Sequence, residues 1–111
     1  MLTFCKVAAI AYLTGDPDLQ YTPNKKAVVN FGIATNRKWK DESGQGHEDT
    51  MFIDCTAWGK VAELVNEHIG KGDPIYIEGH LRLERWEGQD GTKRSKHTIS
   101  ISHVIFLKPK D

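Results

Sequence analysis

Four aromatic side chains in this 111-residue chain, taken with lysines and arginines near them or later on the same strands, could do chemistry together. They are Trp39, Phe52, Trp58 and Trp86. An aromatic ring offers a flat apolar surface on which an unpaired base can stack, and each stacked base is worth about 1–3 kcal/mol. Neighbouring cations can pair with the phosphates that link such bases. The residue types and their spacing therefore predict a surface that binds single-stranded nucleic acid by stacking and phosphate contact.

Basic residues adjoin or follow these aromatics at short intervals. Those assigned to phosphate contact are Arg37, Lys38, Lys40, Lys60, Arg82, Arg85, Lys93 and Arg94. Asp54 and Glu84 count against the interpretation, because alternation puts them on the strand faces of the proposed stacking residues, where they would repel phosphate. For each aromatic residue the alternative role is a place in the hydrophobic core.

The net charge is zero, but the charges are unevenly distributed. Residues 1–40 hold six Lys and Arg against two Asp and Glu, and residues 79–111 hold seven against four. Residues 41–78 hold two against nine. A fold that brings the two ends of the chain together would create a basic face on a neutral protein.

Catalysis, metal binding and cofactor binding find little support in the sequence. No nucleophile–base spacing or phosphate-cradling glycine loop stands out. Cys5 and Cys55 do not form a CxxC pair, and the five histidines lack the spacing of a metal site. We expect no enzyme activity, no metal and no cofactor. No stretch is long and apolar enough to cross a membrane, and we expect a cytoplasmic protein.

The hydrophobic pattern predicts five strands and one short helix. The strands cover residues 3–14, 27–40, 50–58, 74–86 and 93–107, and the helix covers 60–69. The first strand is apolar in succession, which predicts burial on both faces. The second is too long for the core and must bend or project as a finger, before a loop at 41–48. In the fourth, alternation points Ile75, Ile77, Leu81 and Leu83 inward, and in the fifth a change of phase predicts a bulge near His103.

This order of elements predicts an all-β protein with an OB-fold. The OB-fold is a five-stranded Greek-key barrel, here with one short helix between the third and fourth strands. At 111 residues the chain is one domain. We assign residues 1–108 to the barrel, and residues 109–111 to a frayed end or the start of a linker.

Several short motifs, in this order and spacing, carry a family resemblance over residues 4–107. They are Gly15-Asp16-Pro17-Asp18, Tyr21-Thr22-Pro23-Asn24, Ala27-Val28-Val29-Asn30-Phe31, Thr50-x-Phe52, Trp58-Gly59-Lys60-Val61-Ala62-Glu63, Lys71-Gly72, Tyr76-Ile77-Glu78-Gly79-x-Leu81-Arg82 and Trp86. On these residues the chain resembles the bacterial single-stranded DNA-binding protein family, the homotetrameric replication type. The resemblance implies sequence-nonspecific binding and protection of single-stranded DNA in replication, recombination and repair.

The resemblance also implies roles for individual residues. Bases stack in the family at the positions of Trp39, Phe52, Trp58 and Trp86, the four that spacing had already selected. The positions implied to contact phosphate are Lys6, Lys60, Lys71 and Arg82. A homotetramer is implied, with a dimer as the alternative, and the residues implied at its interfaces are Lys6, Val7, Ala8, Ala9, Ile10 and Tyr76.

The family further carries a disordered tail whose acidic tip recruits replication and repair enzymes. This chain ends at Asp111 without such a tip, so partners recruited through a tail are not expected for the chain as given. A protein of this family is expected in the cytoplasm, associated with the nucleoid. The alternative function is that of a tailless OB-fold accessory or adaptor, similar to a primosome protein, whose main partner is another protein.

Overall fold

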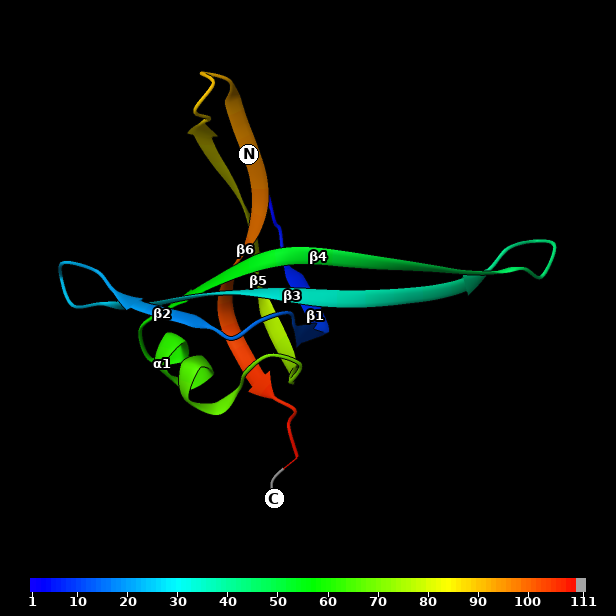
Figure 1. Ribbon diagram of the computed structural model, residues 1–111, viewed down its shortest axis with the longest axis horizontal. Coiled ribbons are helices and arrows are strands. Elements are labelled where there is room, and N and C mark those ends of the chain that lie inside the picture. The colour runs from blue at the N-terminus through cyan, green and yellow to red at the C-terminus, as the bar shows by residue number, and fades with distance from the viewer. Residues whose placement is uncertain (110–111) are drawn as a thin grey trace.

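The computed structural model describes residues 1–109 of the chain. This part contains six strands and one helix, joined by turns and loops (Figure 1). In chain order they are β1 Val7–Leu13, β2 Asp18–Tyr21, β3 Ala27–Lys40, β4 Gly46–Trp58, α1 Gly59–His68, β5 Pro74–Glu87 and β6 Lys93–Phe106. The short strand β2 was not predicted, because its sequence lies between two turn motifs and carries little apolar alternation.

The strands close into a barrel. Their order in the sheet is β1-β5-β6-β4-β3-β2, and a further pairing of β1 with β3 joins the ends. Five strands therefore form the closed barrel, while β2 pairs only with the first half of β3. The helix follows β4 and precedes β5, the third and fourth of the predicted strands. This arrangement confirms the predicted OB-fold.

The core is built from aliphatic side chains that alternate along the strands. Its largest fully buried members are Ile33, Ile75, Ile77, Ile99, Val29 and Val65. The helix α1 covers one end of the barrel and contributes Ala62 and Val65, followed by Ile69 just beyond its last turn. A ten-residue helix is marginal by itself, so packing on the barrel is what stabilises it.

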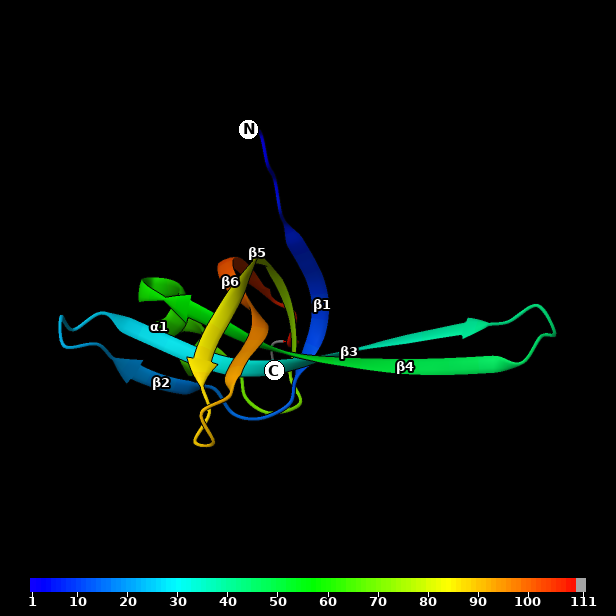
Figure 2. The ribbon, with the colours of Figure 1, turned by 90° about the horizontal axis from the view of Figure 1, so that it is seen from above.

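Two β-hairpins project beyond the barrel as arms (Figures 1 and 2). The β3–β4 arm continues in register to the pair Lys40 and Gly46, and the β5–β6 arm continues to Glu87 and Lys93. The arms explain a radius of gyration of 16.5 Å, against about 13 Å for a compact chain of this length. The predicted finger on the second strand is thus present. The prediction that Leu81 and Leu83 point into the core is wrong. Their side chains are 42% and 44% exposed, because β5 has left the core there.

The first strand also differs from its prediction. Burial on both faces was expected, but β1 alternates: Ala11 and Leu13 are buried, while Ile10 and Tyr12 are 66% and 59% exposed. The reason is that only one side of β1 faces the barrel core, since β5 and β3 lie beside it rather than over it. The single chain thus leaves apolar side chains of β1 uncovered.

The predicted bulge near His103 is confirmed. The register between β5 and β6 shifts where Glu78 pairs with His103 and Gly79 pairs with Ile101, which leaves Ser102 as the extra residue. The bulge reverses the phase of β6, so Ile99 and Ile101 face the core before it, and Val104 and Phe106 pack against the core after it. Of the predicted linker or frayed end at 109–111, residues 110 and 111 lie outside the described part of the chain.

Gly79 is required by this bulge. A Cβ at this position would overlap the backbone carbonyl oxygen of Ser100 on the neighbouring strand, which cannot move without breaking the ladder. We therefore expect Gly79→Ala to lower the free energy of unfolding by about 1–3 kcal/mol. Urea denaturation would measure it. Gly46→Ala is the control, since a Cβ there meets nothing within 4 Å; equal stability of the two variants would contradict the prediction.

Candidate nucleic-acid interface

Three of the four selected aromatics lie on one continuous face of the sheet. Phe52 and Trp58 are an even number of residues apart on β4, and so share a face with Thr56. The parallel ladder places Thr56 beside Ser100 of β6. Along β6 the same face continues through Lys96 to Arg94, whose cross-strand partner on β5 is Trp86. The register of three strands, β4, β6 and β5, therefore brings Phe52, Trp58 and Trp86 onto one outer surface.

All four aromatic side chains lie outside the buried core. Phe52 is 70% exposed and Trp86 is 46% exposed, whereas Trp39 and Trp58 are half-buried. The core alternative considered for each residue from the sequence is therefore wrong for the single chain. Two large aromatic side chains this accessible are available to a ligand.

Trp58 is joined to the β5–β6 arm by a cation. The Arg82 guanidinium carbon lies 5.6 Å from the centre of the Trp58 ring, within the range of a cation–π contact. Trp58 stands where β4 ends, immediately before Gly59 begins the helix with a positive φ of 65°. The strand–helix junction fixes the position of the ring, while Arg82 places a positive charge beside it.

The fourth aromatic, Trp39, is not on this face. It pairs across the β3–β4 arm with His47, in the phase opposite to Phe52. Its ring is stacked on the His47 ring at 5.2 Å between centroids, and the Arg37 guanidinium lies 5.1 Å from it. His47 in turn contacts Asp41 at 2.8 Å. Hydrogen bonds from Ser43, from His47 and from the Gln45 backbone lower the pKa of Asp41 to about 2.

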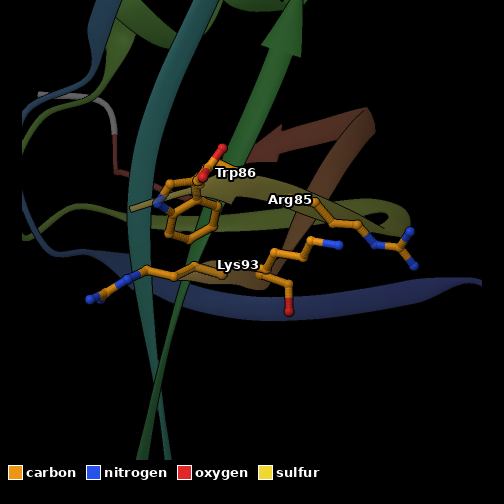
Figure 3. Close-up of a pocket in the computed structure, with 6 residues that line it drawn as sticks. Arg85, Trp86 and Lys93 are labelled. Atoms are coloured by element: carbon orange, nitrogen blue, oxygen red, sulfur yellow. The ribbon is translucent and has the colours of Figure 1, made fainter. Parts of the chain in front are cut away.

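The predicted phosphate contacts divide between the faces. Lys38 and Lys40 share the face of Phe52, and Arg37 shares that of Trp39. On the other arm, Arg82 and Arg94 share the face of Trp86, whereas Arg85 and Lys93 are on the opposite face. Figure 3 shows the Arg85 and Lys93 side chains pointing away from the Trp86 ring.

Three further predicted cations stand apart from the arms. Lys60 is exposed in the first turn of α1, and Lys71 is exposed in the loop before β5, where Asp16 accepts a hydrogen bond from its backbone N–H at 2.9 Å. Lys6 pairs with Glu78 at 3.2 Å. The structure therefore does not bring all the predicted basic residues to one place.

Lys96 is a residue of this face that was not selected from the sequence. Its ammonium lies 6.0 Å from the centre of the Trp86 ring and 3.0 Å from Asp54 Oδ2 on β4. The alternation of β6 around the predicted hairpin would have placed Lys96 in phase with Trp86. Its pairing with Asp54, 42 residues away, had no signal in the sequence.

The residues implied at an oligomer interface are divided between the two sides of β1 and the neighbouring strand β5. Ala8 and Ile10 point outward, while Val7 and Ala9 pack against the barrel core. No strand within residues 1–109 pairs with the far edge of β1 before Tyr12. Tyr76, beside Ile10 on β5, donates a hydrogen bond to Glu78, which raises the pKa of Tyr76 and lowers that of Glu78.

Two negative findings concern other kinds of site. Within residues 1–109, three or more His, Cys, Asp or Glu side chains do not gather as a metal ion would need. The helix described in this range lacks the length and apolar character that crossing a membrane requires.

The two cysteines differ in their surroundings: Cys5 is exposed and Cys55 is buried. Burial, and to a smaller extent the nearby Asp54 charge, raises the pKa of the Cys55 thiol to about 12.

Comparison with known proteins points to one family. The model of the single-strand binding protein family matches residues 4–107. A single-stranded DNA-binding protein of Helicobacter hepaticus is 42% identical over 105 residues, which cover 95% of this chain and 62% of that protein. One from Neisseria meningitidis is 37% identical, covering 92% of this chain and 59% of its own length. The chain thus spans about 60% of the length of these curated relatives.

Solved structures match the fold. A Plasmodium falciparum SSB in complex with ssDNA superposes with a TM-score of 0.90, at 22% identity, over 97% of this chain and 98% of that one. A deletion mutant of the single-stranded DNA binding protein from Thermus aquaticus has a TM-score of 0.82 at 30% identity, over 95% of this chain and 51% of that one. The barrel and its arms are therefore a known architecture.

Proposed function

Because this chain belongs to the single-strand binding protein family, we propose that it binds and protects single-stranded DNA without sequence preference, in replication, recombination and repair. The observation that carries the proposal is the common face of Phe52, Trp58 and Trp86, with cations beside the two tryptophans. Base stacking is tolerant of sequence because every base has a π-face.

The proposed mechanism combines stacking with phosphate neutralisation. Three stacked bases would contribute on the order of 3–9 kcal/mol before the cost of ordering the strand. Phosphates between them would meet the cations of the same face, chiefly Arg82 and Lys38. Trp39 would take part from the other face of the β3–β4 arm, where a base must displace His47 or Arg37 from its ring. Its contribution is therefore smaller.

We also propose that the chain assembles as a homotetramer. Support comes from Ile10 and Tyr12, exposed on β1, together with Ile105, 47% exposed on the adjoining part of the same sheet. The far edge of β1 offers unpaired backbone groups to a second copy. The proposed role is binding without catalysis, in the cytoplasm at the nucleoid. The adaptor alternative is not favoured, since the relatives are named as single-stranded DNA-binding proteins.

The first experiment is a titration of intrinsic tryptophan fluorescence with oligo-dT at low and high salt. We expect saturable quenching, because stacked bases quench the rings of Trp58 and Trp86, and an affinity that falls as salt rises. The end point gives the nucleotides bound per chain. Absence of quenching and of binding at low salt would refute the proposed function.

A further inference from the structure

Lys96 lies between the aromatic residues of the two arms. It shares the face of Trp86 on the β5–β6 arm, with its ammonium 6.0 Å from the centre of that ring. It also lines a groove together with Phe52 of the β3–β4 arm. A strand of DNA whose bases stack on Phe52 and Trp86 must carry its phosphates past Lys96. Lys96 is therefore well placed to neutralise one of them.

Asp54 forms an ion pair with Lys96. The Lys96 ammonium donates a hydrogen bond to Asp54 Oδ2 at 3.0 Å, which links β6 to β4 across the groove. This hydrogen bond raises the pKa of Lys96 above its ordinary value. The two side chains are 46% and 61% exposed. An ion pair this accessible to water is weak, and a phosphate can compete for the lysine.

Glu84 provides a matched comparison on the same face. It is the cross-strand partner of Lys96 on β5, and it lines a groove with Asp54 and Lys96. Its charge reaches Lys96 only through space, as a minor contribution to the raised pKa. Among the ion pairs found in residues 1–109, Lys96 pairs with Asp54 and not with Glu84. The two carboxylates thus present similar charge to DNA, but only one holds the lysine.

We infer that Lys96 is a phosphate-binding residue held by Asp54 as an internal counterion, and that DNA binds here by exchanging the Asp54 carboxylate for a phosphate. The inference rests on the proposed function. It assigns a role to Asp54, which from the sequence alone only opposes binding. Asp54 keeps the lysine extended across the groove between the aromatics, and it weakens the grip on DNA so that the strand can be released.

The exchange has a consequence for salt dependence. A lysine that newly neutralises a phosphate on single-stranded nucleic acid steepens the plot of log affinity against log salt by about 0.7. If Lys96 exchanges the Asp54 carboxylate for a phosphate, the number of neutralised negative charges changes little, because the Asp54 carboxylate is then left unpaired in the groove. In the parent protein, Lys96 should therefore add little to the slope of log affinity against log salt. In a variant without the Asp54 charge, Lys96 should add its full contribution to that slope.

The experiment measures oligo-dT affinity by fluorescence anisotropy over a range of salt for the parent, Asp54→Asn, Glu84→Gln, Lys96→Met and the double variant Asp54→Asn with Lys96→Met. The Asp54 and Lys96 side chains are exposed and Glu84 is half-buried, and none of the three is part of the core. We expect Asp54→Asn to tighten low-salt binding by up to about fivefold more than Glu84→Gln does, and to steepen the slope by about 0.7. In the Lys96→Met background the excess gain should disappear.

Equal gains from Asp54→Asn and Glu84→Gln would overturn the inference, because both would then act only as distant charges. The inference would also be overturned if Asp54→Asn increased the affinity for oligo-dT equally in the parent and in the Lys96→Met background. In both cases the parent still binds oligo-dT, so the proposed function stands while the exchange is refuted. A parent that fails to bind oligo-dT at low salt would instead refute the proposed function, and the exchange with it.

Discussion

Replacing Phe52 and Trp86 together by alanine should weaken binding of oligo-dT by at least about 30-fold, since each lost stack is worth about 1–3 kcal/mol. These two residues are the most accessible of the four aromatics and stand on different arms. The two losses should therefore be nearly additive. Because neither ring is part of the core, the double variant should keep its thermal stability. Anisotropy of a labelled oligo-dT measures the affinity at fixed salt.

Met51→Ala is the matched control for this pair. Met51 is 48% exposed and adjoins Phe52 on β4, but its side chain is in the opposite phase of the strand. Its truncation removes an exposed apolar side chain from the arm without touching the face of Phe52, Trp58 and Trp86. We expect its affinity to equal that of the parent. If the double variant binds as tightly as Met51→Ala, Phe52 and Trp86 do not stack bases.

Residue type and local spacing were enough to predict much of this architecture. The strand–helix–strand order, the projecting β3 and the bulge at Ser102 all follow from a hydrophobic period that is visible within each segment. The exposure of Trp86 was also predictable, because it sits among charged neighbours next to a polar loop. Such features are local, so they depend little on how distant segments pair.

Features that depend on pairing between segments could not be predicted. Trp39 has the same residue type and charged neighbours as Trp86, yet the register of the β3–β4 arm puts it on the other face. Leu81 and Leu83 have the phase of core residues, but β5 leaves the barrel where its pairing with β1 ends, at Val7 and Gly79. The contact of Lys96 with Asp54 likewise depends on how two arms are placed around one barrel.

A charge placed on the outer face of β1 should have the largest effect on the binding of long oligo-dT, because it should prevent the chains from assembling. Ile10→Glu puts a carboxylate where the proposed interface buries an apolar side chain, and an uncompensated buried charge is strongly unfavourable. We expect the parent to assemble from four chains of 12.5 kDa and the variant to dissociate. Long oligo-dT, which spans several chains, should then bind on the order of 100-fold more weakly. Light scattering after gel filtration and anisotropy measure the two effects.

A short oligo-dT that fits on one chain separates assembly from the site itself. Ile10 is on the outside of β1, two strands away from Phe52 across β3, and it is not one of the proposed stacking or phosphate-binding residues. Ile10→Glu should therefore bind the short strand as the parent does. Tyr21→Glu is the control for added charge, because Tyr21 is 59% exposed on β2, away from β1. An Ile10→Glu variant that keeps the parent's mass would show that β1 is not the interface. Equal weakening for short and long strands would show that the substitution acts on the stacking face instead of on avidity.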